Sequence, residues 1–246
     1  MIENKKAQVV ILSDAHYGHR LHHNKLWEHV LNWLIKEKDT WIITNGDLCE
    51  TGTRYSYGLF DQIISPQQQM DDMIDYLEPL AKQGKIIGMI DGNHEARVTK
   101  NSSISPTKNM SRILGVDYFK SGLFLNCKVR KKGAKNAKKY TMYGTHGRSG
   151  AYRLSGKMNA CRELDRACVA DVYFLGHVHA LLSWQEIVRV LKYKKLTDKV
   201  RHYIITGSYL KWEGSYIQEK GRAQSTSLGS PKVYFHNDTN RISVKT

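Results

Sequence analysis

Five short polar clusters recur along this chain, and each follows a run of apolar, β-forming residues. The runs begin at Val9, Trp41, Ile86, Tyr140 and Val172. Short apolar runs of this kind predict buried strands of an α/β sheet. The clusters that follow them supply carboxylate, imidazole and amide side chains: Asp14 and His16, Asp47 and Glu50, Asn93 and His94, His146, and His177 and His179.

Helical spacing of apolar residues separates the first three predicted strands. It covers residues 26–34 and 70–80, and Pro66 stands where the first turn of the second helix should begin. Strand, helix and strand in alternation predict a parallel βαβ arrangement. Because open α/β sheets place their ligands beyond the carboxyl ends of the strands, we expect the five clusters to meet at one edge.

The rest of the chain predicts further helices and a second sheet. Residues 102–115 and 153–170 are expected to be helical, and residues 181–191, 200–206, 232–236 and 242–245 to form the strands of a hairpin-rich second sheet. We therefore expect an α/β fold, a two-sheet mixed β-sandwich flanked by helices. With 41% hydrophobic residues and no Pro-rich or Ser-rich linker, residues 1–246 are expected to form a single domain.

The ligand types in the clusters predict a pair of transition-metal ions. Imidazole together with carboxylate suits Mn, Fe, Co, Ni or Zn better than Mg or Ca. Two such ions about 3.5 to 4 Å apart are the arrangement that two-metal phosphoester hydrolysis uses. Asp47 stands in the middle of the order and is the expected bridging ligand, and manganese is the metal that we favour.

The order and spacing of these motifs resemble those of the calcineurin-like metallophosphoesterases. The motifs are D-x-H, G-D-x-x-E, G-N-H-E, G-x-H-G and G-H-x-H, and they extend from Asp14 to His179. The resemblance implies the fold of that family and attack on phosphorus by a hydroxide that bridges two metals. It implies the following ligands: Asp14, His16 and His179 for one ion, Asn93, His146 and His177 for the other, and Asp47 for both.

The same resemblance gives His94 and Glu50 catalytic roles. His94 would stay free of metal and would donate a proton to the departing alkoxide or stabilise charge on the phosphoryl group, and Glu50 would orient it. This chain has Thr51 where many relatives have an arginine that grips phosphate, which argues against a protein phosphatase. Residues close to the motifs are the candidates for substrate contacts: Arg54, Tyr57, Arg97 and Arg148.

An excess of basic residues favours a polyanionic partner. Lys and Arg number 38 against 23 Asp and Glu, a formal net charge of +15. The basic residues are densest in residues 128–139 and 189–201. Either segment alone could be a solvated hairpin tip, but both together with a phosphoester site favour contacts to a nucleic-acid backbone.

These observations lead to one preferred function and several alternatives. We expect a metal-dependent phosphodiesterase that acts on nucleic acid or nucleotides. A phosphomonoesterase, a cyclic-nucleotide phosphodiesterase and a basic nucleic-acid-binding module without catalysis are the alternatives. The sequence shows no apolar segment for secretion or membrane insertion, so we expect a cytoplasmic protein without a membrane partner. The choice between DNA and RNA, the mode of cleavage and the oligomeric state stay open.

Overall fold

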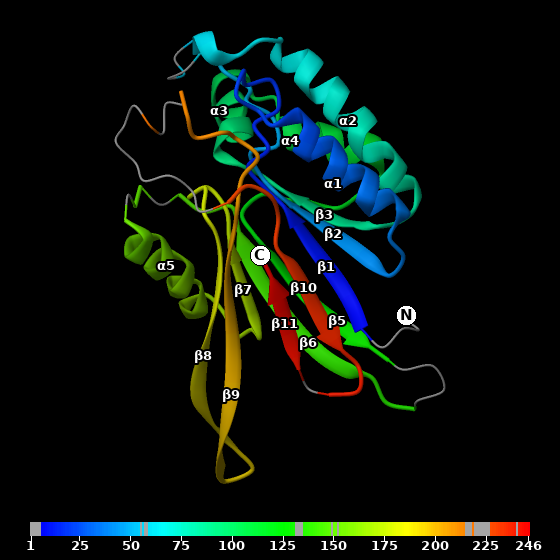
Figure 1. The fold of residues 1–246 in the computed structure, drawn as a ribbon, viewed down its shortest axis with the longest axis vertical. Coiled ribbons are helices and arrows are strands. Elements are labelled where there is room, and N and C mark those ends of the chain that lie inside the picture. Colours follow the sequence, from blue (N-terminus) through cyan, green and yellow to red (C-terminus); the bar gives the residue numbers. More distant parts are fainter. Residues whose placement is uncertain are drawn as a thin grey trace.

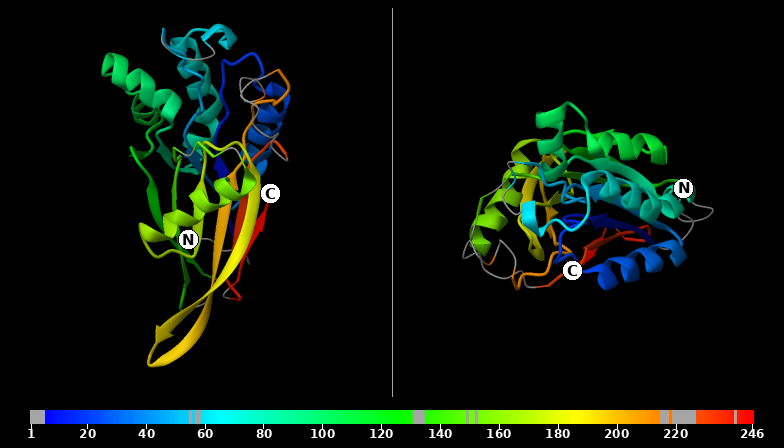
Figure 2. Two further views of the ribbon diagram at one scale, coloured as in Figure 1. Left: turned by 90° about the vertical axis from the view of Figure 1, so that its left-hand side faces the viewer. Right: turned by 90° about the horizontal axis from the view of Figure 1, so that it is seen from above.

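Two β-sheets pack face to face and carry helices on their outer faces (Figures 1 and 2). The computed structural model describes residues 6–54, 56, 59–130, 135–148, 150–151, 153–214, 218, 227–239 and 241–246. The predicted α/β fold, a two-sheet mixed sandwich flanked by helices, is confirmed. Tyr57, one of the candidates for substrate contacts, lies outside the described residues.

The first sheet has six strands, three of which carry metal motifs at their ends. Its order is β11 (Ile242–Lys245), β10 (Lys232–His236), β1 (Lys6–Leu12), β2 (Thr40–Asn45), β3 (Ile86–Ile90) and β4 (Tyr118–Phe119). Strands β1 to β4 are parallel, whereas β10 is antiparallel to both β1 and β11. The loops after β1, β2 and β3 therefore leave the same edge of this sheet.

The second sheet has five strands in the order β5 (Leu123–Val129), β6 (Lys138–Thr145), β7 (Val172–Leu175), β9 (Lys195–Thr206) and β8 (Leu181–Lys192). Strands β6, β7 and β9 are parallel, and the two edge strands are antiparallel to their neighbours. Motifs follow β6 and β7, so this sheet also presents its ligands at one edge.

Helices cover the outer face of each sheet. On the first sheet lie α1 (Asn24–Lys36), α2 (Pro66–Lys82) and α4 (Pro106–Leu114), while α5 (Leu154–Arg162) covers the second sheet. The remaining helical segments are α3 (Asn93–Ser102) and the short 3-10 turns η1 (Leu59–Asp61) and η2 (Glu163–Arg166). None of the helices in the described part of the chain has both the length and the apolar composition of a membrane-spanning helix.

Alternate residues of β1 enter different cores. Val10 and Leu12 pack with α1 and α2, whereas Val9 and Ile11 pack between the two sheets. Both faces of this strand are therefore buried, which explains why its sequence is a continuous apolar run instead of an alternating pattern.

Several sequence predictions were wrong in detail. Helix α3 was not predicted, and the helix expected over residues 102–115 begins only at Pro106, because Ser103 takes a left-handed conformation with φ of 61°. The helix expected over residues 153–170 ends at Arg162 and continues as η2. Strands β10 and β11 were expected in the second sheet, but they pair beside β1 and complete the first.

We predict that Gly144→Ala destabilises the fold. Gly144 lies in β6, and a Cβ there would lie 2.2 Å from the ring of Phe174, which is fully buried between the sheets. Such overpacking costs about 1 to 3 kcal/mol, measurable as a lower free energy of unfolding in urea. Gly150→Ala is the control, because a Cβ at Gly150 meets nothing within 4 Å. Equal stabilities of the two variants would contradict the packing argument.

Candidate metal centre

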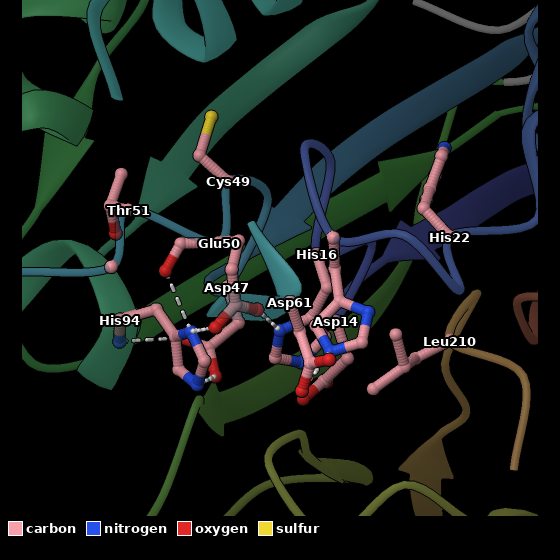
Figure 3. Close-up of polar contacts among 12 residues, drawn as sticks. Asp14, His16, His22, Asp47, Cys49, Glu50, Thr51, Asp61, His94 and Leu210 are labelled. Carbon is pink, nitrogen blue, oxygen red and sulfur yellow. Dashed lines mark hydrogen bonds and ion pairs between the residues drawn. The ribbon is translucent and has the colours of Figure 1, made fainter. Parts of the chain in front are cut away.

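The five polar clusters converge where the motif-bearing strands of both sheets end. Figure 3 shows residues of the first three clusters: Asp14, His16, Asp47, Glu50 and His94. Two groups of side chains that share no residue bring potential ligand atoms within 4.8 Å of one another: Asp14, His16 and His179 in the first group, and Asp47, His146 and His177 in the second. A third group with the same spacing, His16, Asp47 and His94, overlaps both and includes the histidine that was expected to stay free of metal. Asn93 joins the second group, since its Oδ1 is 3.0 Å from Nε2 of His146. The seven residues expected as metal ligands therefore lie close together, and their division between two ions stays a prediction.

The backbone is strained where these ligands lie. Five of them have φ between 47° and 66°, the left-handed region that residues with a Cβ rarely adopt: Asp14, His16, Asp47, His177 and His179. Such conformations cost of order 1 to 3 kcal/mol each and tend to cluster at functional sites. The fold thus accepts local strain in order to direct these side chains inward.

In the first group, three potential ligand atoms face one another. Nε2 of His179 is 3.2 Å from Oδ1 of Asp14 and 3.1 Å from Nε2 of His16. The carboxylate of Asp14 also accepts hydrogen bonds from the backbone N–H of His177, at 3.1 Å to either oxygen. The loops after β1 and β7 are therefore joined through one buried carboxylate.

In the second group, Asp47 contacts His146 directly. Oδ2 of Asp47 is 3.0 Å from Nε2 of His146. The other ring nitrogen of His146, Nδ1, is 2.7 Å from the backbone oxygen of Asn45. This contact fixes the ring so that Nε2 faces the cluster, as an outer hydrogen bond does for many metal-binding histidines.

The charges of the site favour a cation between the two carboxylates. Asp14 and Asp47 are almost completely buried, with 0% and 1% of their surface exposed. Burial raises the pKa of each, but the neighbouring histidines, His146 first among them, outweigh burial and hold both pKa values below the usual range. For His146 itself, burial lowers the pKa, and Asp47 and Asp14 outweigh it and raise the pKa to about 10. Divalent ions would supply the positive charge that these carboxylates attract.

Two of the histidines are suited to act as neutral ligands. Burial and the nearby ring of His94 together lower the pKa of His16 to about 4, although Glu50 acts in the opposite direction. Burial likewise lowers the pKa of His177 to about 4. Imidazole must be unprotonated to bind a metal, so both rings are ready to do so at neutral pH. The donor set present in the site therefore fits a pair of divalent metal ions.

His94 lies beside these groups and contacts Glu50. Nδ1 of His94 is 2.9 Å from the backbone oxygen of Glu50 and 3.3 Å from its Oε1, while Oε2 is 2.9 Å from Nδ1 of His16. One carboxylate thus touches both rings (Figure 3). Nε2 of His94 is 3.9 Å from Oδ2 of Asp47. Burial lowers the pKa of His94, but Asp47 and Glu50 outweigh it, so the pKa is raised overall.

Glu95 has a role that the sequence analysis did not identify. Its two carboxylate oxygens accept the backbone N–H groups of Asp47 and Cys49, each at 3.0 Å. Burial, strengthened by the charge of Asp47, raises the pKa of Glu95 to about 7. Glu95 therefore holds the loop that carries Asp47. The only signal for this in the sequence is its place directly after His94.

The candidates for substrate contacts occupy different positions. Arg54 and Arg148 are exposed in the loops that follow β2 and β6. Arg97 reaches the site from α3, where its Nη2 donates to the backbone oxygen of Glu50 and, at 3.1 Å, to Oε1 of Glu50. Its guanidinium also contacts Nδ1 of His94. Arg97 thus supports the pair of Glu50 and His94 and stands next to the expected position of a substrate.

Comparison with known families identifies the class of protein. Residues 7–181 match the family model described as calcineurin-like phosphoesterase. The chain belongs to this family. It is therefore a hydrolase that acts on phosphoesters, and its family is one of dinuclear metal-dependent enzymes. The two ligand groups described above are the residues of this chain that could hold such a metal pair.

Other comparisons add little about the substrate. No curated protein matches the sequence. The nuclease MPE of Pseudomonas putida is 12% identical, with a TM-score of 0.41 and 96% of this chain and 87% of the nuclease covered. A hypothetical protein of Pyrococcus horikoshii is 10% identical, with a TM-score of 0.45 and 97% of this chain and 87% of that protein covered. The NAD nucleotidase of Haemophilus influenzae is 11% identical, with a TM-score of 0.43 and 98% of this chain and 49% of the nucleotidase covered.

We predict that Asp47→Asn lowers the metal content of the protein. The change removes a negative charge between the two ligand groups but keeps an oxygen that can accept the 2.8 Å hydrogen bond from the backbone N–H of His94. Metal content after dialysis against manganese, measured by mass spectrometry, should fall from two ions per chain toward one or none. Asp117→Asn, an exposed carboxylate outside the site, is the control. A variant that keeps two ions would rule out the bridging role.

Proposed function

We propose that this phosphoesterase hydrolyses phosphodiester bonds in nucleic acid or nucleotides. The observation that supports this most is the arrangement of two ligand groups around Asp47 with His94 beside them. The carboxylates and imidazoles suit two metal ions, and His94 provides a separate proton donor at the same place. Both functions accelerate hydrolysis of a diester with an alkoxide leaving group.

The ligand sets follow from the two groups. Asp14, His16 and His179 would hold one ion, and Asn93, His146 and His177 the other, with Asp47 shared between them. Manganese is the metal that we favour, and Fe, Ni, Co and Zn suit the same donors. When bound, such a pair activates water for attack and neutralises charge on the phosphoryl oxygens.

The residues around His94 are arranged for proton donation. Contacts from Glu50 and Arg97 hold the Nδ1 side of the ring, so Nε2 is directed toward Asp47 and the ligand groups. We assign to His94 the transfer of a proton from Nε2 to the leaving oxygen. Glu50 acts as a positioning residue, because its carboxylate fixes both His94 and His16.

Charge supports a diester within a polyanion over a monoester. A monoester carries more charge on its phosphoryl group than a diester, and an arginine fork is a common way to bind it. Here the guanidinium of Arg97 is engaged with Glu50. The net charge of +15 favours a long polyanion such as nucleic acid.

The location and the domain organisation belong to the same proposal. All four cysteines are free thiols, as a reducing compartment would keep them. Cys49 is buried with its Sγ 3.5 Å from the backbone oxygen of Gln69, and burial raises its pKa well above the usual range. It is therefore a packing residue instead of a metal ligand. We propose a cytoplasmic enzyme in which residues 1–246 form one domain.

A panel of substrates tests the proposed function. We expect bis-p-nitrophenyl phosphate to be hydrolysed with a higher kcat/KM than p-nitrophenyl phosphate, and DNA or RNA to be cut, when manganese is added. The panel should include single- and double-stranded nucleic acid and cyclic nucleotides, each with Mn, Ni, Mg and Zn. A preference for the monoester, or cleavage of cyclic nucleotides alone, would contradict the proposal.

We predict that His94→Ala lowers turnover without removing metal. Loss of a positioned proton donor costs about 100- to 10,000-fold, and the loss should be largest for substrates with poor leaving groups. Turnover of a nitrophenyl diester and of an alkyl diester, together with metal content, measures this. His29→Ala on α1 is the control, because His29 is exposed. Equal losses on both esters, or loss of metal, would contradict the assignment.

A further inference from the structure

Two hairpins extend from the second sheet at the end away from the metal centre (Figures 1 and 2). The first joins β5 to β6 and the second joins β8 to β9. Strands β6 and β9 begin at these hairpins and end near the ligand clusters, since His146 directly follows β6 and Gly207 bonds to Ala180, the neighbour of His179. The 12 residues of β9 span roughly 35 Å, at about 3.3 Å per residue.

The tip of the second hairpin has an unfavourable backbone. Strands β8 and β9 pair without interruption from Leu181 and Thr206 to Lys192 and Lys195. The two connecting residues, Tyr193 and Lys194, have φ of 48° and 64°. A two-residue turn of this kind favours Asn and Gly, and other side chains are strained there. The chain accepts this strain and places a lysine at the exposed tip.

The neighbouring hairpin contains an unfavourable pair of charges. Lys128 and Lys139 lie directly opposite each other on β5 and β6, and both are exposed. Like charges in this position destabilise a sheet. We refer to Lys128, Lys139, Lys194 and Lys195 as the basic end of the sheet.

The nearby acids do not neutralise the basic end. Asp171 pairs with Lys199 at 2.8 Å, and Asp198 pairs with Arg189 at 3.5 Å. Over the residues that the structure describes, the four lysines of the basic end form no ion pair with an acidic side chain. The positive charge of the basic end is therefore available to an external anion.

We infer that the basic end is a second binding surface for nucleic acid, which contacts the phosphate backbone away from the metal centre. This inference rests on the proposed function, because nucleic acid is the substrate class that it names. A projecting two-stranded ribbon fits the major groove of a duplex. Lysines that contact phosphates add affinity without sequence preference. A duplex that touches both the basic end and the metal centre must be at least about ten base pairs long.

An exposed apolar stripe on the other face of the hairpin suggests a competing occupant. Ile187 pairs with Val200 and Leu191 with Leu196 across the two strands, and these four residues are 42% to 74% exposed. A second copy of the chain could cover this stripe. The ion pair of Arg189 and Asp198 divides this stripe into two small patches, which argues against a second copy as its occupant. The unpaired lysines of the basic end favour nucleic acid instead.

The test compares two triple variants of equal charge change. The first carries Lys128→Gln, Lys194→Gln and Lys195→Gln, and the control carries Lys25→Gln, Lys36→Gln and Lys108→Gln on α1 and α4, where all three lysines are exposed. Both are made in the full-length, manganese-loaded protein that also carries His94→Ala, which keeps the probe intact. Binding to a duplex of about 30 base pairs and to a hairpin duplex of about six is measured by fluorescence anisotropy at several salt concentrations.

We expect the first triple variant to bind the long duplex at least about tenfold more weakly at low salt. Its plot of log K against log salt should become shallower by up to about 2.7, at roughly 0.9 per lost phosphate contact. The affinity of the control triple variant for the long duplex should change little. The two triple variants should bind the short duplex equally well. Because the removed charges repel each other in the free protein, the melting temperature should not fall.

Other outcomes separate this inference from the proposed function. Equal losses in both triple variants, or an unchanged salt slope in the first, would overturn the inference. A dimer in sedimentation that Leu196→Lys dissociates, with duplex binding intact in the first triple variant, would assign the hairpin to self-association and also overturn it. If the protein with His94 intact hydrolyses bis-p-nitrophenyl phosphate but never cuts nucleic acid, while binding still depends on the basic end, the binding surface stands and the proposed nuclease activity fails.

Discussion

The carboxylate of Asp47 is the contact on which the geometry of the site depends. Oδ2 meets His146 from the second sheet at 3.0 Å, and Oδ1 accepts the backbone N–H of His94 at the start of α3. The backbone N–H of Asp47 in turn donates to Glu95. One buried side chain therefore ties together the ends of β2, β3 and β6. A carboxylate buried in this way needs positive partners, so the alignment of the two sheets and the charge balance of the site depend on each other.

The strained backbone at the ligand residues also results from the need to bring their side chains to one point. A residue at the end of a buried strand normally continues in an extended conformation and directs its side chain into one of the two cores. The left-handed conformations of Asp14, Asp47 and His177 turn these side chains out of the cores and toward one point. The loops after β2 and β3 approach each other closely here, and Gly92 allows this because it has no side chain. A Cβ on Gly92 would lie 2.1 Å from the backbone nitrogen of Asp47. Packing of the sandwich must therefore offset the cost of the site.

The sequence was sufficient to predict the strands that carry motifs, because each is a buried run that ends in a polar cluster. It also predicted which side chains would meet, since parallel strands present their carboxyl ends at one edge. Helix α3 was missed because its sequence is polar and has no apolar periodicity. Its start is fixed by the hydrogen bond from the backbone N–H of His94 to Asp47, which is a tertiary contact.

Local sequence patterns could not predict which sheet a strand joins, for a similar reason. Alternation in residues 232–236 indicates a strand, but only long-range pairing, such as Ala7 with Phe235, places it beside β1. The role of Glu95 likewise depends on a loop nearly 50 positions earlier in the chain.

Glu50 shows the limit of assigning one role to each motif residue. Its Oε2 contacts the expected metal ligand His16 at 2.9 Å, and its Oε1 contacts the expected proton donor His94 at 3.3 Å. A change at Glu50 would disturb a ligand and a proton donor together, so the function of His94 can be isolated only by changing His94 itself.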